Sequence, residues 1–201
     1  MATATPGFFL YKQPRWKRAF DLALAAWFLV LAGPLLVLCW LAIQLTSYGP
    51  ALHWSRRVGK DNTLFLMPKF RTMRNDAPQV ATHLLKDPER YLTPVGRFLR
   101  KTSLDELPQL ASVLKGHLSL VGPRPALFNQ DDLVALRTQI GVHRMMPGIT
   151  GWAQVNGRDE MEIPEKVRYD AEYMQSQSLR FDMKILAVTV LKVLKTDGVQ
   201  H

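Results

Sequence analysis

The longest apolar stretch of the sequence lies near its N-terminus. Between Ala19 and Leu52 the only charged residue is Asp21. If Leu22–Thr46 formed one straight helix, it would reach roughly 37 Å at about 1.5 Å per residue. The hydrocarbon core of a bilayer is about 30 Å thick, so this length is sufficient to span it. The pattern therefore predicts a membrane helix.

Two features favour a broken helix that enters and leaves the same leaflet. Gly33-Pro34 lies near the middle of the run, where proline removes a helix hydrogen bond and glycine loosens the backbone. Each half would then be roughly 17 Å long, too short to cross alone. Basic residues also flank both ends, which places both ends in the cytoplasm: Lys12, Arg15, Lys17 and Arg18 before the run, and Arg56, Arg57 and Lys60 after it. The residues alone leave open a re-entrant hairpin and a kinked span, since prolines also occur in transmembrane helices.

The rest of the chain reads as helices with short extended segments. Short extended or irregular segments are predicted around the turn 59–62, at Leu52–Val58 and Thr63–Phe70. A loop is predicted at Tyr91–Leu99, followed by a basic helical turn. A second loop is predicted at Met146–Arg158. Helices are predicted at Ala77–Leu85, from Asp105 or Pro108 to Leu114, at Asp131–Ile140, Pro164–Gln177 and Asp182–Leu194.

The fold class follows from these elements. We expect a mainly α protein with short β segments and long ordered loops, carrying an N-terminal membrane element and helices on the membrane surface. The division is a basic segment at 1–18, the membrane element at 19–52 and a cytosolic domain at 53–201. At 201 residues the chain can bury a real core.

Charge and cysteine content narrow the setting. With 26 Lys and Arg against 17 Asp and Glu, the formal net charge is +9. Such a surface attracts nucleic acid, anionic lipid or phosphorylated ligands, and the charge alone does not choose among them. The single cysteine, Cys39, lies inside the apolar run. This excludes a disulfide framework and a cysteine-based zinc site, and fits a reducing compartment.

The adjacent acids Asp105 and Glu106 are the leading candidates for chemistry. Two neighbouring carboxylates can bind a divalent metal, and one of them can act as a nucleophile. The segment Ser103-Leu104-Asp105-Glu106 also fits a helix capping box, with Ser103 as the cap and Glu106 reaching back. Pro108 complicates that interpretation because a helix starting at Ser103 would lose a hydrogen bond there. In both cases the carboxylates lie near a helix N-terminus, whose dipole favours their ionised form.

Basic residues in or near rigid loops are the candidate phosphate ligands. Lys69, Arg71 and Arg97 lie in basic segments, and Arg124 lies between Pro123 and Pro125. Arginine binds phosphate oxygens through two parallel hydrogen bonds. Most surface arginines are merely solvated, but two flanking prolines fix the backbone that presents Arg124. The sequence therefore favours Arg124 as a preorganised phosphate contact.

A glycine-rich segment at 147–158 offers a second kind of binding group. It contains Trp152, Gln154, Asn156 and Arg158. These could bind a base or sugar by stacking and hydrogen bonding, or form a structural loop with a buried tryptophan. The sequence has no P-loop, G-x-G-x-x-G or H-E-x-x-H motif, and its histidines show no metal-ligand spacing.

Taken in order, these segments resemble the bacterial sugar transferases called monotopic phosphoglycosyl transferases. The resemblance covers about residues 15–197. The matching blocks are 17–21, the apolar run, 57–59, 69–73, the long block 96–110, 119–125 and 147–158. Several blocks in one order are far more specific than any one of them alone.

The resemblance implies transfer of a sugar 1-phosphate from a UDP-sugar to polyprenyl (undecaprenyl) phosphate, with release of UMP. It also implies Mg²⁺ dependence, a re-entrant helix-break-helix as the membrane element at 19–52, and a cytosolic catalytic domain at 53–201. Asp105 would attack the sugar-bearing phosphate and form a covalent intermediate, Glu106 would help to bind the metal, and Arg124 would bind phosphate. The expected location is the cytoplasmic face of a bacterial inner membrane, with membrane lipids as partners and no nucleic acid. A homodimer is left open.

The chain departs from the family's sequence pattern at two positions. The family often has Ser-Pro at the membrane break, whereas this chain has Gly33-Pro34. It usually has a residue other than proline before the Lys-Phe-Arg block, where this chain has Pro68.

Two other functions are alternatives. A membrane-anchored adaptor that binds anionic lipid or nucleic acid would show salt-sensitive binding without nucleotide turnover. A transferase that moves sugar without phosphate would release UDP in place of UMP.

Overall fold

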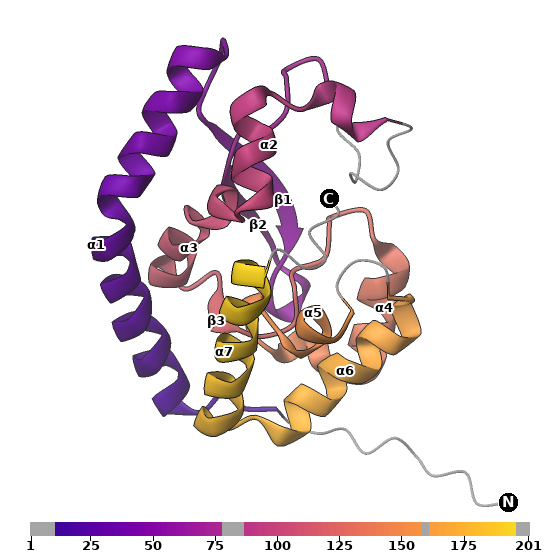
Figure 1. Cartoon of the computed structure of the whole chain (residues 1–201). Coiled ribbons are helices and arrows are strands. Elements are labelled where there is room, and N and C mark those ends of the chain that lie inside the picture. Colours follow the sequence, from indigo (N-terminus) through magenta and orange to yellow (C-terminus); the bar gives the residue numbers. More distant parts are fainter. Residues whose placement is uncertain (1–10, 78–86, 158–160, 196–201) are drawn as a thin grey trace, which may run out of the picture.

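The computed structural model describes residues 11–77, 87–157 and 161–195. Within them the fold is mainly helical with short strands, as predicted. The long helix α1 (Arg15–Thr46) runs along one side of the molecule and curves around the remaining elements (Figure 1). Its 32 residues correspond to about 48 Å. By length and composition it is the one helix of the described residues that could cross a membrane.

The expected break at Gly33-Pro34 does not interrupt α1. The helix continues through both residues, so the two predicted half-helices are one helix. Proline costs one backbone hydrogen bond there, but the bonds on either side remain and keep the backbone helical. The space around Gly33 is open, so its lack of a side chain serves no close contact. The helix also starts at Arg15, four residues before the predicted membrane element.

Two antiparallel strands form a ribbon next to α1. Strand β1 (Leu52–Val58) pairs with β2 (Leu64–Phe70), with Leu52 opposite Phe70 and Val58 opposite Leu64. Both segments were predicted as extended or irregular, and the structure shows that they are strands. Because side chains alternate across a ribbon, Lys69 lies on the face opposite to Pro68 and Phe70.

Helix α2 (Pro94–Lys101) replaces much of the loop predicted at Tyr91–Leu99. It is capped by the Thr93 side chain, which accepts a hydrogen bond from Gly96 N at 2.9 Å. Gly96 lies against the backbone of Thr72, where a Cβ atom would come within 1.9 Å of the Thr72 carbonyl oxygen. Only glycine allows this approach. Helix α3 (Gln109–Lys115) then ends at Gly116, as predicted from Pro108 and Gly116.

The second half of the chain forms a parallel strand pair surrounded by helices. Strands β3 (Ser119–Val121) and β4 (Gly148–Thr150) pair in parallel, and neither was predicted. Around them lie α4 (Asp131–Gln139), α5 (Trp152–Asn156), α6 (Ile163–Ser176) and α7 (Leu179–Lys195) (Figure 1). The predictions for α4 and α6 are confirmed, α7 begins three residues earlier, and β4 with α5 replaces the loop predicted at Met146–Arg158. The helix predicted at Ala77–Leu85 lies almost wholly outside the described residues.

Both ends of α1 pack on the same globular body. Near its start, Lys17 pairs with Asp21 at 2.8 Å and with Asp182 of α7 at 3.0 Å. Asp21 also accepts hydrogen bonds from Ser119 Oγ and Leu120 N, and all three charged side chains are buried. Near its end, the buried face of α1 packs against the ribbon and α2 through Cys39, Ile43, Ala51, Phe70 and Leu99. The body thus binds the helix by charge at one end and by apolar packing at the other.

Candidate active site

The two acids lie in a tight turn between α2 and α3. Leu104–Glu106 form a 3-10 turn, and Ser103 before it has a left-handed backbone with φ of 56°. The Ser103 side chain makes no capping hydrogen bond. The capping-box interpretation is therefore wrong, and α3 starts beyond Pro108. Asp105 and Glu106 serve no capping function that would explain their presence.

Two cations bind one oxygen of Glu106. Lys69 Nζ donates to Glu106 Oε1 at 2.7 Å, and Arg124 Nη2 donates to the same oxygen at 2.9 Å. Burial opposes ionisation of Glu106, but the charges and hydrogen bonds of Arg124 and Lys69 overcome it and keep its pKa well below the usual range. The structure therefore brings together three predicted residues from β2, the acid turn and the proline-flanked loop.

Asp105 lies in a different electrostatic environment. It is 7% exposed, and its Oδ1 is buried without a hydrogen-bond partner among the described residues. Burial, and then the neighbouring charge of Glu106, raise the pKa of Asp105 to about 6, against the opposing charges of Lys69, Arg100 and Arg124. A buried carboxylate with an unused oxygen is costly for folding alone. This cost is typical of a group kept for chemistry.

Arg100 is a site residue that the sequence-based candidates missed. Its charge lowers the pKa of Asp105, and its Nε donates to Thr72 Oγ1 at 2.9 Å. Residues four apart share a helix face. Arg100 follows Gly96 by four residues and therefore lies on the face packed against Thr72. In the sequence, Gly96 was the residue that could have indicated which face of this helix packs closely against another segment.

Arg71 and Arg97 have other contacts in the described structure. The buried Arg71 guanidinium donates to the carbonyl oxygens of Ser47 and Tyr48, and so binds the chain just beyond α1. Arg97 is exposed and pairs with Glu89 at 3.0 Å. Neither residue shows a contact with Glu106. Their predicted role as phosphate ligands remains a prediction.

The segment after β4 is folded and partly buried. Trp152 packs edge-on against Phe181 with ring centroids 4.9 Å apart. Gln154 Nε2 donates to the Ile149 carbonyl at 3.0 Å, and Asn156 Nδ2 donates to the Trp152 carbonyl at 2.8 Å. These amides thus stabilise their own segment. Their predicted role in binding the donor stays a prediction, and Arg158 lies outside the described residues.

The acid pair provides ligands of the kind that Mg²⁺ uses. Magnesium is commonly bound by one or two carboxylates, with substrate phosphates and water completing its octahedral shell. The unpaired Asp105 Oδ1 is a ready ligand, and Glu106 is the adjacent carboxylate. The described residues contain no group of three or more acidic, histidine or cysteine side chains that could bind a metal unaided. The donor set therefore fits a metal that arrives with a phosphorylated substrate.

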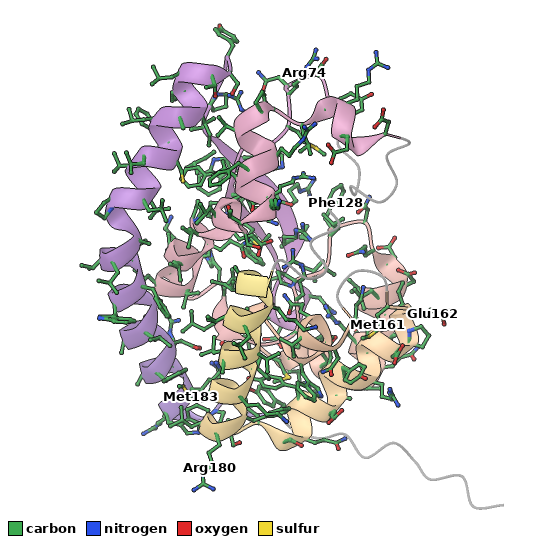
Figure 2. The ribbon with its side chains drawn as sticks, in the orientation of Figure 1. Arg74, Phe128, Met161, Glu162, Arg180 and Met183 are labelled. Atoms are coloured by element: carbon green, nitrogen blue, oxygen red, sulfur yellow. The ribbon has the colours of Figure 1, made fainter. Side chains whose placement is uncertain are left out.

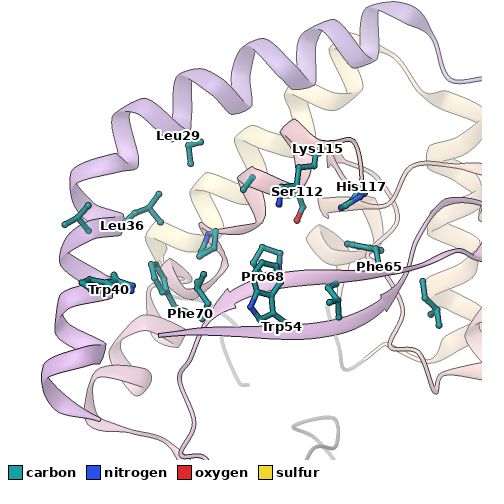
Figure 3. Close-up of a pocket in the computed structure, with 16 residues that line it drawn as sticks. Leu29, Leu36, Trp40, Trp54, Phe65, Pro68, Phe70, Ser112, Lys115 and His117 are labelled. Atoms are coloured by element: carbon teal, nitrogen blue, oxygen red, sulfur yellow. The ribbon is translucent and has the colours of Figure 1, made fainter. Parts of the chain in front are cut away.

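A large apolar chamber lies between the middle of α1, the ribbon and α3 (Figure 3). Its volume is about 670 Å³. Leu36 and Trp40 of α1 and Phe70 of β2 lie around one end, whereas Ser112, Lys115 and His117 lie toward the other (Figure 3). Pro68 and Phe70 line it, whereas Lys69, which alternates with them along β2, does not. Neither Asp105 nor Glu106 lines the chamber, so it is separate from the acids.

The sequence matches the bacterial sugar transferase family over residues 12–196. The chain belongs to this family. The family resemblance inferred from the ordered motifs is therefore confirmed. The prediction that the chain is an enzyme of the phosphoglycosyl transferase class is confirmed with it.

Three similar proteins carry informative names. A protein of Bacillus subtilis named an uncharacterized sugar transferase is 41% identical over 92% of this chain and 90% of its own length. A UDP-glucose:undecaprenyl-phosphate glucose-1-phosphate transferase of Escherichia coli is 42% identical over 88% of the chain. An undecaprenyl-phosphate galactose phosphotransferase of Salmonella typhimurium is 38% identical over 90% of it. The chain spans only 39% and 41% of the last two proteins.

Proposed function

We propose that this protein transfers a sugar 1-phosphate from a UDP-sugar to undecaprenyl phosphate, releases UMP and so starts assembly of a surface polysaccharide. The observation that carries the proposal is the contrast within the acid pair. Glu106 is neutralised by Lys69 and Arg124, whereas Asp105 keeps a buried oxygen unpaired. The names of the relatives supply the substrate class.

In the first step the Asp105 carboxylate attacks the sugar-bearing phosphorus of the UDP-sugar. A new bond forms between the carboxylate oxygen and phosphorus, and the bond to the bridging oxygen breaks. UMP leaves with the electron pair, and an aspartyl-phosphosugar remains. No proton is required, provided that Asp105 is ionised. Such a covalent step divides one difficult displacement into two easier ones.

In the second step a phosphate oxygen of undecaprenyl phosphate attacks the same phosphorus. The bond between phosphorus and Asp105 breaks, so the carboxylate is regenerated and a lipid diphosphate sugar is formed. Lys69 and Arg124, which converge on Glu106, are positioned to balance negative charge on the phosphoryl group. Bound Mg²⁺ would add charge stabilisation at the phosphate oxygens, with Asp105 and Glu106 as its protein ligands.

The pKa of Asp105 sets a pH dependence. Because the nucleophile must be ionised and its pKa is raised to about 6, we expect kcat/KM to rise with pH through about 6 and to level off above it. An ordinary aspartate would place this limb near pH 4. Initial rates of UMP release from pH 4.5 to 8.5 measure the limb. A flat profile across that range would contradict the assignment.

We further propose that α1 attaches the protein to one leaflet. Its outward face is apolar, including Trp27, Val30, Leu31 and Leu45, which are 56–84% exposed. Both of its ends bind the same body. A spanning α1 would place that body, with its ion pairs, in hydrocarbon, which is costly. An α1 that lies along one leaflet keeps both basic flanks on the same side of the membrane, as the predicted re-entrant element would, but without the predicted break.

Neighbouring elements extend the apolar surface. Trp54 and Leu66 of the ribbon are half exposed beside the chamber, and Met183 of α7 is 50% exposed. Figure 2 shows Arg180 projecting outward from the start of α7, beside Met183. An amphipathic helix with a basic edge lies well at a bilayer interface. These residues agree with the predicted membrane-surface helices.

Cysteine labelling tests this topology. After Cys39→Ala, single cysteines replace Lys12 and Tyr48, the second of which is 96% exposed. We expect both to react with a membrane-impermeant maleimide in inside-out vesicles and neither to react in intact cells. Reaction of one position from each side would show that α1 spans the bilayer.

The proposed chemistry is tested by incubating the purified protein with Mg²⁺, undecaprenyl phosphate and a panel of UDP-sugars. We expect UMP release with one or a few of the sugars. Salt-sensitive lipid binding without any UMP release would identify an adaptor. UDP release would identify a transferase that moves sugar alone.

A further inference from the structure

Four consecutive carbonyl oxygens in the loop that carries Arg124 accept hydrogen bonds from three distant parts of the chain. The pairs are Gly148 N to Pro123 O at 2.9 Å, Arg137 Nη1 to Arg124 O at 2.8 Å, Arg57 Nη1 to Pro125 O at 3.2 Å and Val58 N to Ala126 O at 2.9 Å. A loop with this many external contacts has little freedom. Its position depends on β1, β4 and α4.

The contact to the Arg124 carbonyl comes from a side chain that is itself fixed. Arg137 of α4 donates Nε and Nη2 to Asp170 Oδ2 of α6, at 2.9 and 2.6 Å. Its remaining amino group, Nη1, reaches Arg124 O. One planar guanidinium thus joins two helices to the loop, and its fork geometry fixes the direction of each hydrogen bond.

Burial makes this arrangement rigid. Arg137 is 7% exposed and Asp170 is 2% exposed. A buried ion pair contributes little net stability compared with apolar residues of the same size, because both charges lose their hydration. The third hydrogen bond, to the backbone of Arg124, is the feature that an apolar pair could not supply.

We propose that Arg137, oriented by Asp170, is a positioning residue for sugar-phosphate transfer. It holds the backbone of Arg124 so that the Arg124 guanidinium stays on Glu106 Oε1. The inference rests on the proposed function, since it assigns Arg137 to the same reaction. Arg137 acts only through Arg124 and contacts no reacting atom.

Two variants separate positioning from folding. Arg137→Lys keeps the charge next to Asp170, but a single ammonium cannot reproduce the three directed contacts. Arg137→Met with Asp170→Leu removes both buried charges at similar volume, a replacement that proteins commonly tolerate. We expect both to fold and to lose about 10- to 100-fold in kcat, since small displacements of a catalytic group can cost about 10²-fold. KM should change little.

A double-mutant cycle and matched controls complete the test. In an Arg124→Ala background, Arg137→Lys should cause no further loss of kcat, whereas an independent structural role would make the losses multiply. Arg168→Lys makes the same chemical change in an exposed ion pair of α6 and should keep wild-type kcat. Ile185→Ala, in the buried core beneath α7 and away from this loop, should lower Tm and leave kcat nearly unchanged.

A readout independent of activity distinguishes this inference from the proposed function. Hydrogen exchange of a peptide covering residues 122–130 should be faster in Arg137→Lys than in wild type and unchanged in Arg168→Lys. Wild-type kcat and exchange in Arg137→Lys would overturn the inference. A wild-type protein that transfers no sugar phosphate, but shows the faster exchange in the variant, would refute the proposed function and keep the anchoring of the loop.

Discussion

Asp105→Asn is expected to abolish sugar-phosphate transfer, with kcat lower by at least about 10⁴-fold, the scale seen when an enzyme loses its nucleophile. Asparagine has nearly the same shape as aspartate, but its amide oxygen carries no charge and is a very poor nucleophile. The measurement is UMP release in the presence and absence of undecaprenyl phosphate. Both should fall, because the first step itself is lost.

Protein stability provides the control for Asp105→Asn. The raised pKa means that folding favours the protonated form of Asp105. Its ionisation therefore lowers stability as the pH rises from about 4 through about 6. We expect the variant to have a Tm at pH 8 no lower than that of wild type. Asp131→Asn, an exposed acid at the start of α4, should keep full activity. Full turnover by Asp105→Asn at equal expression would contradict the nucleophile assignment.

Glu106→Gln is expected to lower kcat by about 10²- to 10³-fold, the range found when one preorganised electrostatic group is removed. Glutamine can accept a hydrogen bond at the same place, but it cannot neutralise Lys69 and Arg124. Asp105 then becomes the nearest negative charge to both cations. Because the Glu106 charge raises the pKa of Asp105, its loss should move the acidic limb of kcat/KM to lower pH.

The combination of both effects makes the Glu106→Gln test specific. A general loss of structure would lower kcat, but the molecules that stay active would keep the acidic limb of kcat/KM near pH 6. A pH profile of the residual activity, with Tm measured in the same buffers, separates these cases. An acidic limb that stays near pH 6 in Glu106→Gln would show that the two carboxylates are not coupled.

The parts of the fold that the sequence predicted well depend on local signals. The ribbon follows from two extended segments around one turn, and α3 is bounded by Pro108 and Gly116. Strands β3 and β4 are three residues each and lie far apart in the chain. Their parallel pairing is non-local, and no local pattern marks it. Short strands of this kind become visible only when the chain is folded.

The candidate site was predicted in part for the same reason. Lys69, Glu106 and Arg124 were all named from the sequence, and they meet at one carboxylate oxygen. Arg97 was named and Arg100 was not, although both belong to one basic segment, because the sequence did not show which face of α2 is buried. Ser103 was an acceptable cap by sequence, but its left-handed backbone is a tertiary outcome. Local chemistry identified the residue types, and packing decided which side chains converge.

The destination of the β-phosphate of the donor tests the central claim most directly. A UDP-sugar labelled with ³²P at the β-phosphate is incubated with the protein, Mg²⁺ and undecaprenyl phosphate, and the lipid and nucleotide fractions are separated. The account predicts that the label moves into the lipid fraction in equal amount to the UMP released, and that Asp105→Asn moves none. Label that remains in UDP while the sugar reaches the lipid would contradict it.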